Sequence, residues 1–216
     1  MIASLRHQAV LLLGLVAALA VPSSSGSTIV NSAHDFSALH PGGQICIFCH
    51  TTHNADLTVP DAPLWNHQVT TKTYQLYNSP TMDATMTQPG GSSRLCLSCH
   101  DGTVAIDAYG GDPGTVALTM GGDVAVGAGP EDLTDDHPVS FVYDDTLANN
   151  DGELHAPAST PSGLGSTIAD DLLIAGRLEC ASCHDVHNSG AAATVNDHLL
   201  MITQVDSQLC LTCHDK

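Results

Sequence analysis

All eight cysteines of the 216-residue chain fall into one pattern: two residues separate the members of each cysteine pair, and a histidine follows the second cysteine. Such a pair can add its two thiols to the two vinyl groups of a porphyrin, and the histidine then lies beneath the iron as its proximal axial ligand. The sequence therefore predicts four covalently attached c-type haems. The attachment cysteines are Cys46 and Cys49, Cys96 and Cys99, Cys180 and Cys183, and Cys210 and Cys213, and the proximal ligands are His50, His100, His184 and His214.

Three other uses of paired cysteines explain this pattern less well. A disulfide framework is common in exported proteins, and two Cys₄ zinc sites would also use four C-x-x-C pairs, but neither requires a histidine after every pair. Redox dithiols of the thioredoxin kind occur singly, within a βαβ pattern that this sequence lacks. Because every cysteine belongs to a complete copy of the pattern, haem attachment is the favoured interpretation.

The sixth coordination position of each iron decides between electron transfer and catalysis. The chain has 13 histidines against five lysines and arginines, and this surplus favours a second histidine on each iron. Methionine is the rival axial ligand, and Met82, Met86, Met120 and Met201 are available, although no sequence pattern marks them. We therefore expect bis-histidine iron with no open position.

Five histidines are the best candidates for the distal positions, one more than four irons require. His53 and His187 repeat the arrangement C-H-x-x-H-N, in which the second histidine cannot reach the far face of its own haem but can reach a neighbouring iron. His34 precedes the first motif, and His67 and His137 stand beside Trp, Asn or Pro residues that suggest fixed loops. Three further histidines are expected to be solvated or to support a ligand: His40, His155 and His198.

The composition excludes one class of partner and indicates that side chains alone do not fill the core. A formal net charge of −18 leaves no basic cluster for phosphate contacts, so nucleic acid is not an expected partner. Aromatic residues make up only 4% of the chain, so its own side chains bury modest area and large apolar cofactors are expected to complete the core. The Asp-rich stretches show no ordered ligand spacing, which favours solvated surface over calcium sites.

Residues 1–20 have the features of a secretory signal peptide. Arg6 and His7 precede an apolar run from Ala9 to Ala20, which ends in Ala-Leu-Ala. This run is too short for a membrane span of about 20 apolar residues, and no later segment approaches that length. We therefore expect an exported, extracellular or cell-surface protein, with the periplasm as the alternative.

The haem motifs divide the remaining chain into two similar halves. CHTTHN is followed by LCLSCHD in the first half, and CHDVHN is followed by LCLTCHD in the second. We predict a first dihaem unit at 21–109, a Gly/Asp/Pro-rich connecting segment at 110–170 and a second dihaem unit at 171–216.

Little regular secondary structure is expected in either half. Short helices are predicted at 171–187 and 205–215, with Asp and Ser as N-caps, and brief strands at 101–111 and 116–120. Turn residues dominate the rest of the chain. The predicted fold is that of a multihaem cytochrome c: mostly irregular coil, with short α-helices and few short strands, wrapped around a stacked chain of haems.

Longer stretches carry a family resemblance. In chain order they read SAHDFS, CHTTHNAD, APLWNH, YNSPTM, SSRLCLSCHDGTVA, DLTDDHPVSF, LECASCHDVHN and LCLTCHD, and they run from about residue 32 to residue 216. Together they resemble the doubled-CXXCH multihaem cytochromes, and more narrowly the tetrahaem extracellular cytochromes that polymerise into filaments, or nanowires, in metal-reducing bacteria and some archaea. The connecting stretches, rather than the haem motifs, carry the narrower resemblance.

This resemblance implies a continuous stack of bis-histidine haems and self-association in which one axial histidine comes from the neighbouring subunit. By that likeness His53 is the ligand donated to the neighbour, while His34, His67, His137 and His187 serve haems within the subunit. The implied function is long-range extracellular electron transfer to redox proteins or extracellular acceptors, rather than enzymatic catalysis. A monomeric periplasmic electron carrier is the alternative. A multihaem reductase with an open haem is less favoured, since few basic residues are available for a substrate channel.

Overall fold

The computed structural model describes residues 29–60, 62–115, 125–129, 131–187 and 198–216. The predicted signal peptide and the strand expected at 116–120 lie outside these ranges. Within them, no helix is long and apolar enough to cross a membrane.

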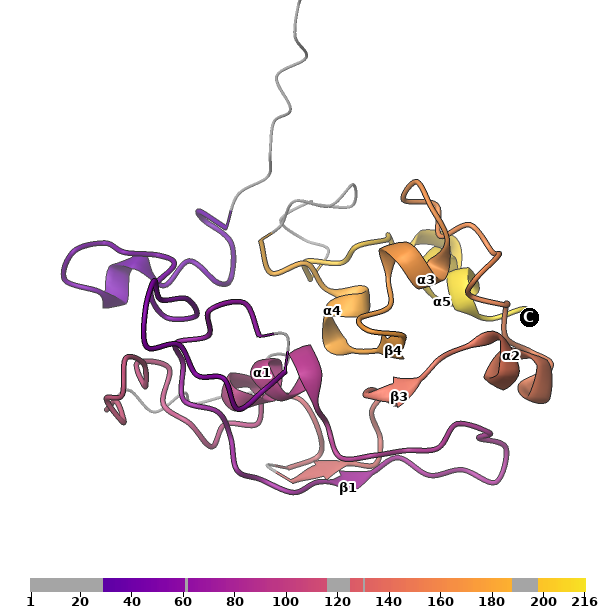
Figure 1. Cartoon of the computed structure of the whole chain (residues 1–216), viewed down its shortest axis with the longest axis horizontal. Helices are drawn as coiled ribbons and strands as arrows, with labels where there is room; N and C mark the ends of the chain where they lie inside the picture. The colour runs from indigo at the N-terminus through magenta and orange to yellow at the C-terminus, as the bar shows by residue number, and fades with distance from the viewer. Residues whose placement is uncertain (1–28, 61, 116–124, 130, 188–197) are drawn as a thin grey trace, which may run out of the picture.

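Regular elements are short and coil separates them, as expected from the sequence (Figure 1). Helix α2 shows how local chemistry sets their limits: the Asp144 side chain accepts a hydrogen bond from Leu147 N at its start, and Gly152, in the left-handed region, ends it. The helices are η1 (Ser37–Leu39), α1 (Gly91–His100), α2 (Asp145–Asp151), α3 (Ile168–Asp171), α4 (Cys180–Cys183), η3 (Val205–Ser207) and α5 (Gln208–Cys213). The strands are β1 (Gln75–Leu76), β2 (Asp132–Leu133), β3 (Phe141–Val142) and β4 (Arg177–Leu178).

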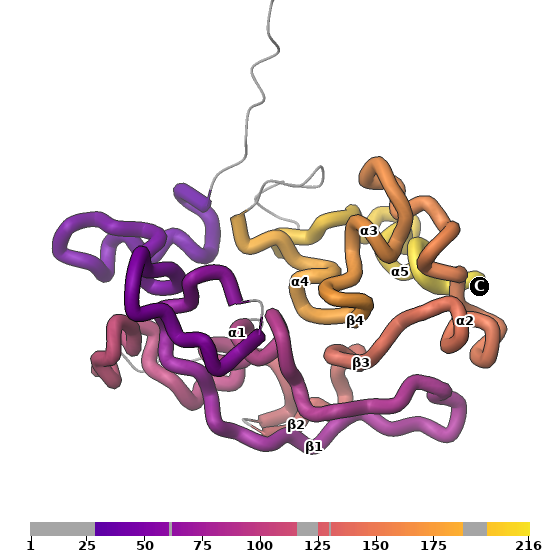
Figure 2. Tube along the Cα trace, in the orientation of Figure 1, coloured from indigo at the N-terminus to yellow at the C-terminus, as the bar shows by residue number. Residues whose placement is uncertain are grey.

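Two small sheets tie the predicted connecting segment to both dihaem units. Strands β1 and β2 pair in parallel, with Leu76 opposite Leu133, so the first unit is joined to the connecting segment. Strands β3 and β4 pair antiparallel, with Phe141 opposite Leu178, so the connecting segment is joined to the second unit. The tube in Figure 2 follows the purple chain after β1 as it runs beneath β3 toward α2. Within this stretch, Thr87 Oγ1 donates a hydrogen bond to the carbonyl oxygen of Ser140, directly before β3, at 3.0 Å.

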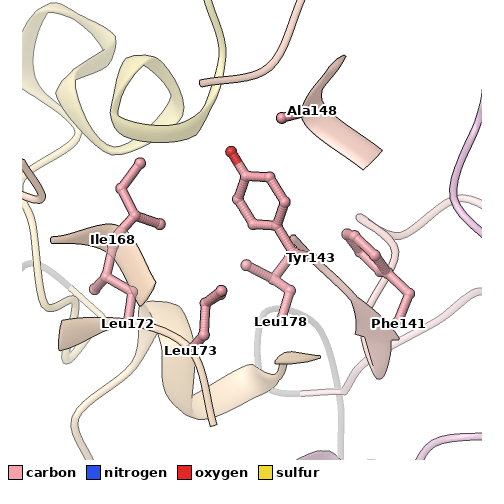
Figure 3. Packing of buried hydrophobic residues seen from close by; sticks show 7 residues of the cluster. All are labelled: Phe141, Tyr143, Ala148, Ile168, Leu172, Leu173 and Leu178. Carbon is pink, nitrogen blue, oxygen red and sulfur yellow. The ribbon is translucent and has the colours of Figure 1, made fainter. Parts of the chain in front are cut away.

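The main apolar core forms where the connecting segment meets the second unit. Its buried residues lie in β3, α2, α3 and β4 or directly after β3 and α3 (Figure 3), and the Tyr143 hydroxyl donates to His155 O at 2.7 Å. A smaller cluster joins Tyr74, Leu97 and Leu133 in the first part of the chain. The main cluster consists of Phe141, Tyr143, Ala148, Ile168, Leu172, Leu173 and Leu178.

The helix predicted at 171–187 is wrong over most of its length. Helix α3 ends at its first residue, and Ala175 and Gly176 then adopt positive φ values of 50° and 74°, which no helix accommodates. The chain leaves this turn as strand β4 and becomes helical again only in α4, whose N-cap is Glu179 rather than Asp. Side-chain pattern favoured a helix here, but the turn and the pairing with β3 override it.

Of the other two predictions of secondary structure, the helix is confirmed in part and the strand is wrong. The helix predicted at 205–215 is confirmed only as α5, and its N-cap Ser207 makes no side-chain capping hydrogen bond. The preceding 3₁₀ turn contains Asp206 at a φ of 53°, so the predicted helix is wrong at its start. The strand expected at 101–111 is wrong: these residues form turns, apart from an isolated bridge between Tyr109 and His67.

Candidate haem-binding sites

Each haem motif folds as a single helical turn. The amide of His50 donates to Cys46 O at 2.8 Å, and the corresponding bonds of the third and fourth motifs measure 3.0 and 2.9 Å. The second motif lies at the end of α1. Residues three and four positions apart share one face of a helical turn. Each turn therefore presents both thiols and the histidine on one side, which is the arrangement that covalent haem attachment requires.

Beyond the turn, three of the four motif histidines join a distant extended segment. Bridges connect His50 to Trp65, His184 to Leu200 and His214 to Leu154. Such pairing holds each histidine against a second part of the chain. The predicted axial ligands are consequently positioned by tertiary structure as well as by the motif.

Hydrogen bonds also orient two of these imidazole rings. His50 Nδ1 lies 2.6 Å from Pro63 O, and His184 Nδ1 lies 2.9 Å from His198 O. A carbonyl oxygen can only accept, so Nδ1 carries the proton and Nε2 keeps its lone pair. Metal-bound histidines commonly make this bond, because it selects the tautomer and fixes the ring. Both residues therefore present Nε2 for coordination.

Three motif histidines each face a histidine that the sequence marks as a distal candidate. The ring centroids are 6.0 Å apart for His50 and His187, 6.0 Å for His100 and His34, and 6.4 Å for His214 and His137. Two imidazoles bound to opposite sides of one metal ion, through bonds of about 2 Å, have ring centroids about 6 Å apart. The three pairs thus fit bis-histidine iron.

His34 shows the electrostatic state that a ligand needs. Burial, followed by the nearby His100, His184 and His187 imidazoles, lowers the pKa of His34 to about 4. Its ring is therefore neutral near pH 7, and metal ligation requires the neutral form. Its Nδ1 is buried without a hydrogen-bond partner, so the ring has an unsatisfied nitrogen.

An apolar cavity of about 240 Å³ lies beside the third haem motif. Cys180, Cys183 and His184 line one part of it, and His137 lines another. The apolar lining suits a porphyrin face, which must be shielded from water. Its aliphatic walls are Leu76, Leu97, Val126, Leu133, Val139 and Leu178.

The structure does not bring the other two distal candidates opposite a motif histidine. His67 is buried, with Nδ1 2.9 Å from Gln68 O and Nε2 3.0 Å from Ala105 O, beside the Cys99 thiol. His53 is exposed and takes part in none of the ring contacts found among the described residues. The roles of His53 and His67 as ligands, like those of the paired histidines, stay predictions.

The second thiol of each motif has a raised pKa. Burial raises the pKa of Cys49, Cys183 and Cys213 to about 11, and that of Cys99 to about 12. Disulfide exchange depends on a thiolate with a lowered pKa. The second cysteine of every motif is therefore poorly suited to thiol redox catalysis.

Two buried carboxylates belong to these sites although the sequence did not single them out. Asp101, directly after His100, accepts hydrogen bonds from Thr70 Oγ1 at 2.8 Å and Tyr74 Oη at 2.6 Å. The recurring Cys-His-Asp order in three of the motifs could have drawn attention to it. Glu179, directly before Cys180, is buried as well, and no local signal distinguishes it from a surface residue.

The second and third motifs meet although they belong to different predicted units. Helices α1 and α4 pack together, and Ser93 Oγ in α1 accepts a hydrogen bond from Cys180 N in α4 at 3.0 Å. Haems attached to these two helices would therefore be neighbours.

Comparison with known proteins supports the haem interpretation. Residues 174–216, which contain the third and fourth motifs, match the family defined by a doubled CXXCH motif. No curated protein matches the chain. The family match indicates a multihaem c-type cytochrome with covalently bound iron porphyrin, a class that serves electron transfer. Haem is joined to such motifs outside the cytoplasm, so the chain is exported.

Proposed function

We propose that this protein conducts electrons over long distances outside the cell, through four stacked c-type haems that are each ligated by two histidines. We further propose that it does so as the subunit of a cytochrome filament. One observation supports the proposal: three motif histidines each have a second imidazole nearby, with 6.0–6.4 Å between the ring centroids. Imidazole on both sides of an iron leaves no position for a substrate.

The chain's own residues set the conditions for this transfer. Each bound haem supplies a one-electron couple between ferric and ferrous iron. The cysteine pairs hold the cofactor covalently, the paired imidazoles close both axial positions, and the apolar cavity excludes water. The many carboxylates surround the sites with negative charge, which favours the ferric state and keeps the reduction potentials low.

The ring pairs lead us to assign one distal ligand to each of three haems. His187 serves the haem of His50, His34 that of His100, and His137 that of His214. The first of these assignments crosses between the two units, so neither unit alone would complete its own iron sites.

The remaining haem is the one on Cys180 and Cys183, where the described residues offer no ring pair for His184. We propose that His53 of a neighbouring copy occupies this position. The exposure of His53 supports donation to another subunit.

Cryo-electron microscopy of the native extracellular fraction tests the assembly. Ordered fibres with continuous haem density are expected, with density joining His53 of one copy to the haem of the next. Dispersed single particles would instead favour a periplasmic carrier and contradict the filament.

Low-temperature electron paramagnetic resonance (EPR) of the assembled protein tests the ligation. We expect four haems per chain, all low-spin, and no cyanide binding to the resting ferric protein. A high-spin signal in the assembled protein, or rapid binding of cyanide, would contradict closed iron sites and would point to a reductase.

A further inference from the structure

We infer that Glu179 is a positioning residue for electron transfer between the second and third haems, because its buried carboxylate joins the two attachment helices and sets the charge where they meet. The inference rests on the proposed function, since it assumes haems on Cys96 and Cys180 that exchange electrons.

Glu179 differs from every other glutamate of the chain in its burial. Its side chain is 1% exposed, whereas Glu131 and Glu153 are 52% and 62% exposed and form surface ion pairs with lysines. A carboxylate withdrawn this far from water is costly unless hydrogen bonds and opposite charge compensate it. The surroundings of Glu179 must therefore be built for a negative group.

Much of that compensation comes from the start of helix α1. The N-cap residue of this helix, Gly90, has no side chain that could satisfy the free amides of the first turn. Glu179 supplies the missing acceptor from a distant part of the chain: Ser93 N donates to its Oε2 at 3.3 Å, and Ser93 Oγ donates to the same oxygen. The positive end of the helix dipole also favours a carboxylate here.

Two further groups complete the carboxylate site. Ser140 Oγ donates to Glu179 Oε2 at 2.7 Å, and Arg177 Nε lies 3.7 Å from Oε1. Gly91 leaves room for the carboxylate, since a Cβ at that position would lie 3.2 Å from Oε1, and its φ of +46° also disfavours a side chain. Each of these features acts on one carboxylate, and none of them belongs to a haem motif.

The same network reaches the haem attachment points directly. Ser93 Oγ, which donates to Glu179, also accepts a hydrogen bond from Cys180 N at 3.0 Å. Cys96 lies three residues after Ser93 in the same helix. Glu179 thus fixes α1 to α4 at the place where two haems from different units approach each other.

A fixed negative charge at this place acts on the reduction potentials. In an interior of low dielectric constant, a nearby anion stabilises ferric over ferrous iron and lowers the potential. Glu179 should therefore hold the potentials of the second and third haems below the values that they would have beside a neutral residue. Its role requires no contact with iron.

The Glu179→Gln variant of the full haem-loaded protein tests this inference by redox titration monitored by EPR at pH 8. Glutamine keeps the size and can still accept hydrogen bonds, but it removes the charge. We expect two of the four potentials to rise and the other two to stay unchanged. The matched control, Glu131→Gln, removes an exposed charge and should leave all four potentials nearly unmoved. Equal behaviour of the two variants would overturn the inference.

A second variant covers the case in which Glu179→Gln does not accumulate. Ser93→Ala keeps the charge of Glu179 but removes a hydroxyl that compensates it, so the same two potentials should fall rather than rise. Unchanged potentials in Ser93→Ala would then refute the role of Glu179. An open or missing haem in the assembled wild-type protein would contradict the proposed function, whereas the direction of these shifts decides the inference about Glu179.

Discussion

The imidazole rings of His50 and His187 lie with their centroids 6.0 Å apart and their planes 15° from parallel. His50 is the histidine of the first haem motif, and His187 stands three residues after the histidine of the third. The histidine that stands three residues after a proximal ligand thus faces the proximal histidine of another motif, in keeping with the expectation that it serves a neighbouring iron.

Replacement of His187 by alanine should open one iron site. We expect one of the four haems to become high-spin and to bind cyanide, because no second histidine ring contacts His50 among the described residues. Absorption and EPR spectra of the ferric protein measure both effects. His155→Ala is the control, since that ring faces no motif histidine among the ring contacts of the described residues. An all-low-spin spectrum of His187→Ala would show that another residue ligates this iron.

Removal of the His53 imidazole should affect assembly rather than folding. Because His53 is exposed, His53→Ala is expected to leave haem attachment intact while the haem of His184 loses its sixth ligand and fibres no longer form. Negative-stain microscopy and the high-spin EPR signal report the two losses together. Normal fibres from His53→Ala would refute donation of this histidine to a neighbouring subunit.

The orientations of the ligand planes should be visible in the EPR spectrum. The rings of His50 and His187 are nearly parallel, whereas those of His137 and His214 are 77° apart. Perpendicular imidazoles leave two iron d orbitals close in energy, which makes the low-spin ferric signal strongly anisotropic, while parallel imidazoles separate them. We expect signals of both kinds, and His137→Ala should abolish a strongly anisotropic one. Loss of a rhombic signal instead would contradict this pairing.

The buried ring of His67 predicts a pH dependence of stability. Burial lowers the pKa of His67 and outweighs the carbonyl contacts with Gln68 and Ala105, which raise it, so the unfolded chain binds a proton more readily than the folded one as the pH falls through about 6.5. Stability contributed by this residue is therefore present above that pH and lost below it. Denaturant titrations at pH 7.5 and 5.5 should show a smaller loss for His67→Asn than for wild type. An equal loss would mean that His67 is not neutral in the folded protein.

The main apolar core is expected to contribute to stability alongside the proposed haems. Ile168 is fully buried, and Ile168→Ala is expected to cost about 2–5 kcal/mol in the free energy of unfolding, through lost transfer energy and the cavity that remains. Val142, which is 51% exposed, provides the control, and Val142→Ala should change stability by less than about 1 kcal/mol. Guanidinium titration of the haem-loaded protein measures both. A loss below 1 kcal/mol for Ile168→Ala would mean that this cluster contributes little.

The sequence alone was sufficient for features that depend on neighbouring residues. Cysteine and histidine at fixed short spacing place two thiols and one imidazole on one face of a turn, so the attachment points and proximal ligands are predictions that need no knowledge of the fold. The scarcity of aromatic residues likewise indicated small apolar cores and short elements, in agreement with the clusters observed.

Tertiary structure decided which distant groups meet. The path of the chain places His187 opposite His50 and buries His67 in contact with Ala105 O. It also places the Glu179 carboxylate at the start of α1, where it accepts a hydrogen bond from Ser93 N. Local propensity also failed at 171–187, where a turn and pairing with β3 replaced the predicted helix. Contacts between residues far apart in sequence depend on the closure of long loops, and no short-range spacing encodes that closure.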